Sequence, residues 1–156
     1  KLRSELQSKG TRSSKRRLLS IAARQSRLRR DVDHCLSKSI VEYCNCNGIS
    51  NIVVEDLTNI RRVSPKFSKS PSTNYKIHMW AFHRLQGFIQ YKAYDSGINF
   101  SKVNPANTST TCPNCNLIDP ANRPTRDTFK CTSCGTYGQS DSIAAYNISR
   151  RFFKQI

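Results

Sequence analysis

The first half of the chain carries apolar residues at the three- and four-residue steps of an amphipathic helix. Side chains at this spacing lie on one face, so residues 13–46 predict one long helix with an apolar stripe. The stripe consists of Leu18, Ile21, Ala22, Leu28, Val32, Cys35, Leu36, Ile40 and Tyr43. A second helical pattern runs from Tyr75 to Ser96, and Gly97 is expected to end it.

Two short segments are typical of β-strands. Residues 52–54, Ile-Val-Val, form a β-branched run, as expected of a strand buried on both faces of a parallel sheet. Residues 98–103 alternate apolar and polar side chains and predict a second strand. The class is therefore α/β. Since ligands bind at the carboxyl ends of strands in open α/β sheets, Glu55 or Asp56 is a candidate site residue, although either could cap the next segment.

A pair of Cys-x-x-Cys motifs is the strongest chemical signal. Fifteen residues separate the two pairs, and few of these are large and apolar. Four thiolates at this spacing surround one tetrahedral Zn²⁺ and leave no open coordination position, so we predict a structural zinc site. Its ligands are Cys112, Cys115, Cys131 and Cys134. Disulfides are the alternative, but seven cysteines, three of them outside the motifs, favour a metal in a reducing compartment.

Positive charge dominates the composition and is concentrated near the amino end. The chain has 26 Lys and Arg against 10 Asp and Glu, a formal charge of +16, and residues 1–30 hold eleven of the basic residues against Glu5 alone. Such a surplus predicts a polyanionic partner, DNA or RNA. The candidate contacts are Arg16, Arg17, Arg24 and Arg27 in the first helix, with Arg61 and Arg62 in a Ser/Pro-rich basic loop over residues 61–74.

Acidic residues of the same helix are expected to neutralise part of this positive charge. Asp31 and Asp33 follow Arg27 and Arg29 by four residues, so helical ion pairs should offset part of it, and a merely solvated basic face is the alternative to nucleic-acid binding. No apolar run approaches the roughly 20 residues that span a bilayer, and the basic start lacks the apolar core of a signal peptide. We expect no membrane partner and a cytoplasmic, nucleoid-associated location.

The last segment, from Ser140 to Phe153, predicts a helix with Asp141 in its first turn. A carboxylate there is favoured by the helix dipole, so capping is the simple interpretation. The alternative interpretation is that Asp141 lies close to Glu55 across the sheet and that the two bind a divalent metal ion.

These segments, taken in order, resemble the carboxyl half of the RuvC-like nuclease domain of TnpB proteins, transposon-encoded RNA-guided DNA endonucleases, and of the related type V CRISPR effectors. The resemblance runs from about Arg24 onward and is carried by the strand with Glu55, the segments Tyr91-Lys92-Ala93 and Gly97-Ile98, Thr108 to Cys115, Cys131 to Gly135, and Asp141 through Ala144-Ala145 to Asn147-Ile148. It implies a partial RNase H-like fold interrupted by a zinc ribbon. It also implies that Glu55 and Asp141 are the second and third catalytic carboxylates, holding Mg²⁺ or Mn²⁺ for two-metal hydrolysis of DNA.

Two departures from the family pattern matter. Ile143 stands where the family commonly has Asn, and no segment ahead of Lys1 carries the family's first catalytic aspartate. We therefore expect a fragment that lacks the first strands, is inactive alone, and works with a guide RNA and the remainder of the same polypeptide. The expected parts are residues 1–104 for the nuclease core, 105–138 for the zinc ribbon and 139–156 for the final helix.

Two other functions stay open at this point. A nuclease-inactive relative that binds DNA as a repressor or transposition factor is favoured by Ile143. A stand-alone zinc-ribbon binder of nucleic acid is the third hypothesis, and the strand ending in Glu55 argues against it.

Overall fold

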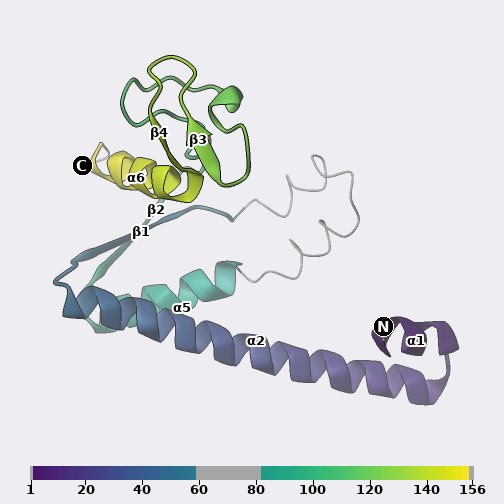
Figure 1. Cartoon of the computed structure of the whole chain (residues 1–156). Helices are drawn as coiled ribbons and strands as arrows, with labels where there is room; N and C mark the ends of the chain where they lie inside the picture. The colour runs from purple at the N-terminus through teal and green to yellow at the C-terminus, as the bar shows by residue number, and fades with distance from the viewer. Residues whose placement is uncertain (1, 59–81, 155–156) are drawn as a thin grey trace.

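The computed structural model describes residues 2–58 and 82–154 (Figure 1). Its longest element is α2 (Arg12–Cys46), a helix of 35 residues that follows the short α1 (Leu2–Lys9). Thr11 caps α2, since its side-chain oxygen accepts a hydrogen bond from the Ser14 amide at 3.2 Å. Gly48, with φ +65°, lets the chain turn back after the helix. The long helix predicted from the apolar spacing is confirmed.

The packed face of α2 is not the apolar stripe. The buried residues in its carboxyl-terminal part are Ser37, Val41 and Cys44, which lie against α5 (Phe82–Asp95) and the sheet. The stripe members Leu28 and Tyr43 are 63% and 65% exposed. In this part of α2 the contacts with α5 thus select a face of the helix next to the apolar stripe.

Side-chain contacts between α2 and α5 fix the helices against each other. The ring of His34 stacks on Phe88 with centroids 3.9 Å apart. Arg84 pairs with Asp33 at 2.6 Å, and both side chains are mostly buried, at 30% and 16% exposed. Asp33, predicted to pair within its own helix, thus bonds a cation from another element.

Two strands lie between helices (Figure 1). β1 (Asn51–Glu55) and β2 (Asn99–Val103) run parallel, with Ile52 opposite Phe100 and Glu55 opposite Val103. Both predicted strands are present, and β1 belongs to a parallel pair, as its β-branched run indicated. The main core packs on one face and consists of Val41, Cys44, Ile89, Ala93, Ile98 and Phe100, with Ile52, Val54 and Leu85 against it.

Full burial of β1 was the wrong expectation. Residues 52–55 are only partly buried. Within the described residues, β2 is the one strand that pairs with β1, so the other edge of β1 has no strand beside it. The opposite face of the pair is covered by α6 (Ser140–Phe153), which packs on both strands.

Residues 104–139, which we call the four-cysteine unit, connect β2 to α6. The unit contains a 3-10 turn, η1 (Pro120–Asn122), and the antiparallel pair β3 (Thr128–Lys130) and β4 (Tyr137–Gln139). Its core is small: Cys112, Phe129 and Cys131, with Ile143 of α6 packed against them. The unit therefore owes little of its stability to apolar burial.

Some sequence predictions lie outside the described residues. These are the basic loop over residues 61–74, with Arg61 and Arg62, and the start of the second helix at Tyr75. The described part of that helix is α5, which Gly97 follows with φ +72°. No helix in the described ranges has the length and hydropathy needed to cross a bilayer.

Candidate metal centre and carboxylate site

The two cysteine pairs sit on loops of equivalent backbone geometry. In the first, the amide of Cys112 donates to the carbonyl of Leu117 at 2.9 Å; in the second, the amide of Cys131 donates to the carbonyl of Thr136 at 2.8 Å. The residue after each second cysteine has a left-handed backbone, with φ 61° at Asn116 and 71° at Gly135. Asn and Gly tolerate this conformation best, which explains these residue types at the two turns.

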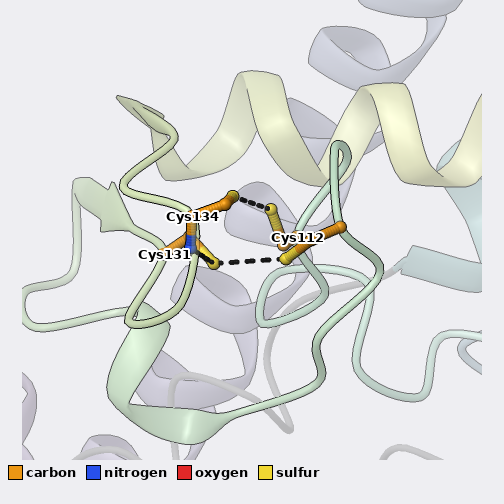
Figure 2. Close-up of side chains that lie close together, drawn as sticks. Cys112, Cys131 and Cys134 are labelled. Atoms are coloured by element: carbon orange, nitrogen blue, oxygen red, sulfur yellow. Dashed lines mark hydrogen bonds between the residues drawn. The ribbon is translucent and has the colours of Figure 1, made fainter.

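The four sulfur atoms form a compact cluster. All lie within 4.8 Å of one another, and the Sγ–Sγ distances are 3.5 Å for Cys112 with Cys134 and 3.5 Å for Cys115 with Cys131. Figure 2 shows Cys112 on one loop facing Cys131 and Cys134 on the other. The cysteines are free thiols, since a disulfide would need about 2.05 Å. Sulfurs bound tetrahedrally at about 2.3 Å from Zn²⁺ are separated by similar distances, so the cluster is consistent with structural zinc.

Hydrogen bonds favour the thiolate at one of these ligands. The hydroxyl of Thr136 lies 3.0 Å from Cys134 Sγ. This bond, together with one from the Thr136 backbone, lowers the pKa of Cys134 to about 6. A thiolate is the form that binds zinc.

Asn122 holds the two loops together, and sequence reasoning missed it. Its side chain is fully buried, with 0% exposure. The amide nitrogen donates to the carbonyls of Thr110 at 2.9 Å and Leu117 at 3.2 Å, beside the first cysteine pair. The amide oxygen accepts from the backbone of Thr132 at 2.9 Å, inside the second pair. Nothing in the sequence marks this asparagine among its neighbours, because the contacts are set by the fold of the loops.

We expect Asn122→Leu to weaken zinc binding about a hundredfold. The substitution removes three hydrogen bonds of a buried side chain and leaves the Thr132 amide without its partner, a loss of about 3 kcal/mol. Competition with a chromophoric zinc chelator measures the affinity. The control is Asn45→Leu, the same change at an exposed position of α2. Equal affinities for the two variants would contradict the role given to Asn122.

Glu55 lies at the carboxyl end of β1 and is held at two points. Its Oε1 accepts a hydrogen bond from the Thr108 hydroxyl at 2.5 Å. Its backbone carbonyl accepts from Gln86 of α5 at 2.8 Å. The carboxylate is half-buried. The strand end is thus tied to both α5 and the four-cysteine unit.

Asp56, the other candidate at this strand end, accepts hydrogen bonds from a residue of its own turn, Thr58. Its Oδ1 accepts from the hydroxyl and, at 3.1 Å, the amide of Thr58. These bonds lower the pKa of Asp56, and the side chain is exposed. Of the two candidates, the geometry therefore favours Glu55 as the site residue and Asp56 as a turn residue.

Asp141 stands in the first turn of α6, exposed, but it is not the cap. Gln139 is the N-cap residue, and its side-chain oxygen accepts from the amide of Ser142 at 3.2 Å and from the Ser142 hydroxyl at 2.8 Å. The simple interpretation of Asp141 as a helix cap is therefore wrong. The dipole at the amino end of α6 stabilises the Asp141 carboxylate, but this side chain does not cap the helix.

A polar contact joins α6 to the start of the four-cysteine unit. Asn147, buried at 5% exposure, donates to the carbonyl of Thr108 at 2.9 Å and to that of Thr111 at 2.8 Å. Thr108 is itself the donor to Glu55. The helix that carries Asp141 and the strand that carries Glu55 are therefore connected through one residue.

In the described ranges, the four cysteines are the one group of three or more His, Cys, Asp or Glu side chains whose ligand atoms lie close enough to share an ion. The other three cysteines are outside it: Cys44 is buried, and burial raises its pKa, while Cys35 and Cys46 are exposed. The predicted contact residues Arg16, Arg17, Arg24 and Arg27 are exposed along α2.

Comparison with known proteins identifies relatives of most of the chain. A family model described as "Cas12f1-like, TNB domain" matches residues 82–148. A CRISPR-associated endodeoxyribonuclease Cas12f1 of Sulfoacidibacillus thermotolerans is 37% identical over 117 residues, which are 75% of this chain and 26% of that protein. The TnpB-like protein MJ0751 of Methanocaldococcus jannaschii is 33% identical over 131 residues, 83% of this chain and 45% of that protein. The chain thus spans less than half of these two relatives.

A shorter relative and a solved structure agree with these matches. The putative transposase MJ0856.1 of Methanocaldococcus jannaschii is 31% identical over 84 residues, which are 49% of this chain and 76% of that protein. In a cryo-EM structure of a Cas12f1-sgRNA-target DNA complex, one chain superposes with a TM-score of 0.70 at 22% identity, over 94% of this chain and 40% of that one. This likeness concerns the fold.

Proposed function

Because this chain belongs to the TnpB/Cas12f family, we propose that it forms the carboxyl-terminal part of a RuvC-like, RNA-guided DNA endonuclease. The observation that carries the proposal is the arrangement of two carboxylates around one pair of strands. Glu55 ends β1, and α6, with Asp141 in its first turn, packs on the same strands. This is the placement expected when a nuclease site forms at the carboxyl edge of a sheet.

Both carboxylates suit a divalent ion. Carboxylate oxygens are the hard ligands that Mg²⁺ and Mn²⁺ prefer, and neither group serves as a helix cap. When bound, such ions activate water and stabilise the leaving oxygen at a phosphodiester. Glu55 and Asp141 would hold them, and a third carboxylate, the family's first catalytic aspartate, would come from the remainder of the polypeptide.

The four-cysteine unit has a structural part in this proposal. Four sulfur ligands leave zinc no open position for substrate, so zinc here organises the loops and is not a Lewis acid. Ile143 and Asn147 of α6 contact the unit. The zinc-bound loops therefore help to place the helix that carries Asp141.

The proposal is tested by guided cleavage. The full-length polypeptide, assembled with its guide RNA, should cut DNA that matches the guide, only when Mg²⁺ or Mn²⁺ is present, and leave a 3′-hydroxyl and a 5′-phosphate. A guide with mismatches in its seed is the control, since base pairing carries the sequence information. Guided binding without cutting under all metal conditions would contradict the endonuclease and support the inactive DNA-binding relative.

The geometry of Ile143 weakens that alternative. The residue packs against Phe129 and the buried cysteines, and its side chain lies 3.4 Å from where a Cβ on Gly138 would be. Positions two residues apart on a helix do not face each other, so Ile143 points away from Asp141. The departure from the family pattern is explained by packing in the four-cysteine unit.

We expect Arg24→Ala with Arg27→Ala to weaken binding to DNA and RNA of unrelated sequence by a similar factor. Both side chains are exposed, and contacts with phosphates carry no base information. The slope of log K against log salt should fall by about 2, one for each lost contact. The control is Lys38→Ala, which removes one positive charge from α2 at a position where the 3.6 Å ion pair with Glu42 is exposed. A loss confined to one sequence would indicate base readout.

A further inference from the structure

Thr108 makes the direct side-chain contact with the Glu55 carboxylate. Its hydroxyl donates to Oε1 at 2.5 Å, and the residue is 4% exposed. Thr108 lies 53 positions after Glu55 in the chain, at the start of the four-cysteine unit. Its hydroxyl is also 3.2 Å from the carbonyl of Pro105, near the beginning of the unit. A short hydrogen bond from a buried donor restricts where the carboxylate can lie.

This bond has a consequence for a metal ligand. A glutamate has three side-chain torsions, and fixing them when an ion binds costs conformational entropy. Thr108 fixes Oε1 beforehand and leaves Oε2 for another partner. Donors that orient metal-binding carboxylates in this way strongly influence metal affinity.

Thr108 is in turn held by α6. The side chain of Asn147 donates to the backbone carbonyls of Thr108 and Thr111, at 2.9 and 2.8 Å, and Thr111 directly precedes Cys112. Asn147 lies six residues after Asp141 in the same helix. The buried amide thus joins three features: the helix of Asp141, the first cysteine pair and the donor to Glu55.

We propose that Thr108 is a positioning residue that sets the Glu55 carboxylate for divalent metal binding, and that Asn147 fixes Thr108 relative to the helix of Asp141. The inference rests on the proposed function, because it assumes that Glu55 is a metal ligand. Thr108 contacts no metal or substrate in this arrangement. It acts through Glu55, and the four-cysteine unit therefore takes part in shaping the nuclease site.

The test uses the full-length polypeptide with its guide RNA and measures Mn²⁺ binding by the EPR signal of the free ion. Thr108→Val keeps the shape and removes the hydroxyl, so the Mn²⁺ affinity should fall about tenfold, and the Mg²⁺ concentration for half-maximal cleavage should rise by the same factor. Thr108→Ser restores the donor and should return both values to within about twofold of the parent. The matched control is Thr128→Val, a threonine of β3 outside this network.

Zinc content and melting temperature are measured on every variant. A purely structural role would move these two values and leave the Mn²⁺ affinity of the folded protein unchanged, which would overturn the inference. If Thr108→Val does not fold, Thr108→Ala gives the same comparison with Thr108→Ser. Equal Mn²⁺ affinity in the Ser variant and the variant without a hydroxyl would also overturn it.

Glu55→Ala separates this inference from the proposed function. If Glu55→Ala loses cleavage and Thr108→Val does not differ from the parent, only the positioning role fails. If Glu55→Ala cleaves normally, the proposed nuclease site itself fails.

The part played by Asn147 is tested by a double-variant cycle. Asn147→Leu removes both donors at similar size, and it should lower the Mn²⁺ affinity by acting on Thr108. The double variant with Thr108→Val should then bind Mn²⁺ as Thr108→Val does alone. Fully additive losses would show that Asn147 acts independently of Thr108.

Discussion

Glu55→Ala and Asp141→Ala should each abolish Mg²⁺-dependent cleavage of guided target DNA while leaving target binding nearly intact. Each carboxylate is proposed to hold a metal ion, and metal stabilisation of the transition state supplies several kcal/mol, so the rate should fall by about a thousandfold or more. Affinity for the target comes from base pairing and from basic residues elsewhere. On the same preparations, single-turnover assays should therefore show the loss of cleavage, and filter binding should show nearly unchanged affinity for the target.

The neighbouring carboxylate provides the control. Asp56→Asn keeps an acceptor for the hydrogen bonds from Thr58 and removes only the charge, so it should cleave at close to the parental rate. Calcium should support binding but little turnover, because its larger and looser coordination misplaces the attacking water. If Asp141→Ala cleaves at the parental rate, Asp141 has no part in the site. If Asp56→Asn loses as much cleavage as Glu55→Ala, the choice of Glu55 over Asp56 as the site residue is wrong.

Zinc removal should unfold the four-cysteine unit. Phe129 is its one large apolar side chain with no exposure, and structural zinc contributes about 10–16 kcal/mol of apparent binding energy in small zinc-binding units. Chelation or Cys112→Ser should therefore abolish the dispersed NMR signals of residues 104–139. Elemental analysis should find one zinc per chain. Thiol titration of the zinc-loaded protein should leave three cysteines free of metal, and buried Cys44 should react more slowly than exposed Cys35 and Cys46.

Acid should release the metal, because zinc binding requires deprotonated cysteines. Hydrogen bonds that lower the pKa of Cys134 to about 6 extend its thiolate form toward lower pH, so Thr136→Val should make release begin at a higher pH. Cys35→Ser, at an exposed position outside the motifs, should leave zinc content unchanged. Iron in place of zinc, purified protein with disulfides, or a folded metal-free unit would contradict the assignment.

The local patterns predicted α2, α5, α6, the strands β1 and β2 and the cysteine pairs, because helix spacing, β-branched runs and Cys-x-x-Cys motifs act over a few residues. They did not predict α1 or the β3–β4 pair. They did not predict which face of α2 packs. That choice depends on Arg84 and Phe88, which contact Asp33 and His34 from a helix some fifty positions away. The apolar stripe of α2 therefore indicates the helix but not the face that is buried.

In the candidate site, too, the sequence predicts some of the important residues and not others. Glu55 and Asp141 could be selected from their positions at a strand end and a helix start. The roles of Asn122, Thr108 and Asn147 could not be predicted, because they come from hydrogen bonds to backbone groups and side chains that only the folded chain brings together. An asparagine or threonine in a loop has many roles, and the sequence alone does not distinguish among them.

The long helix α2 also has a mechanical consequence. The contacts described with α5 begin at Asp33, so about 20 residues of α2 precede them, a length of about 30 Å at about 1.5 Å per residue. Figure 1 shows this part of α2 extending beyond α5. One turn of duplex DNA is about 34 Å, so a straight helix of this length spans most of one turn along the duplex axis. In the proposed nucleic-acid complex, a force on the arginines of this helix would be transmitted as torque to its contacts with α5.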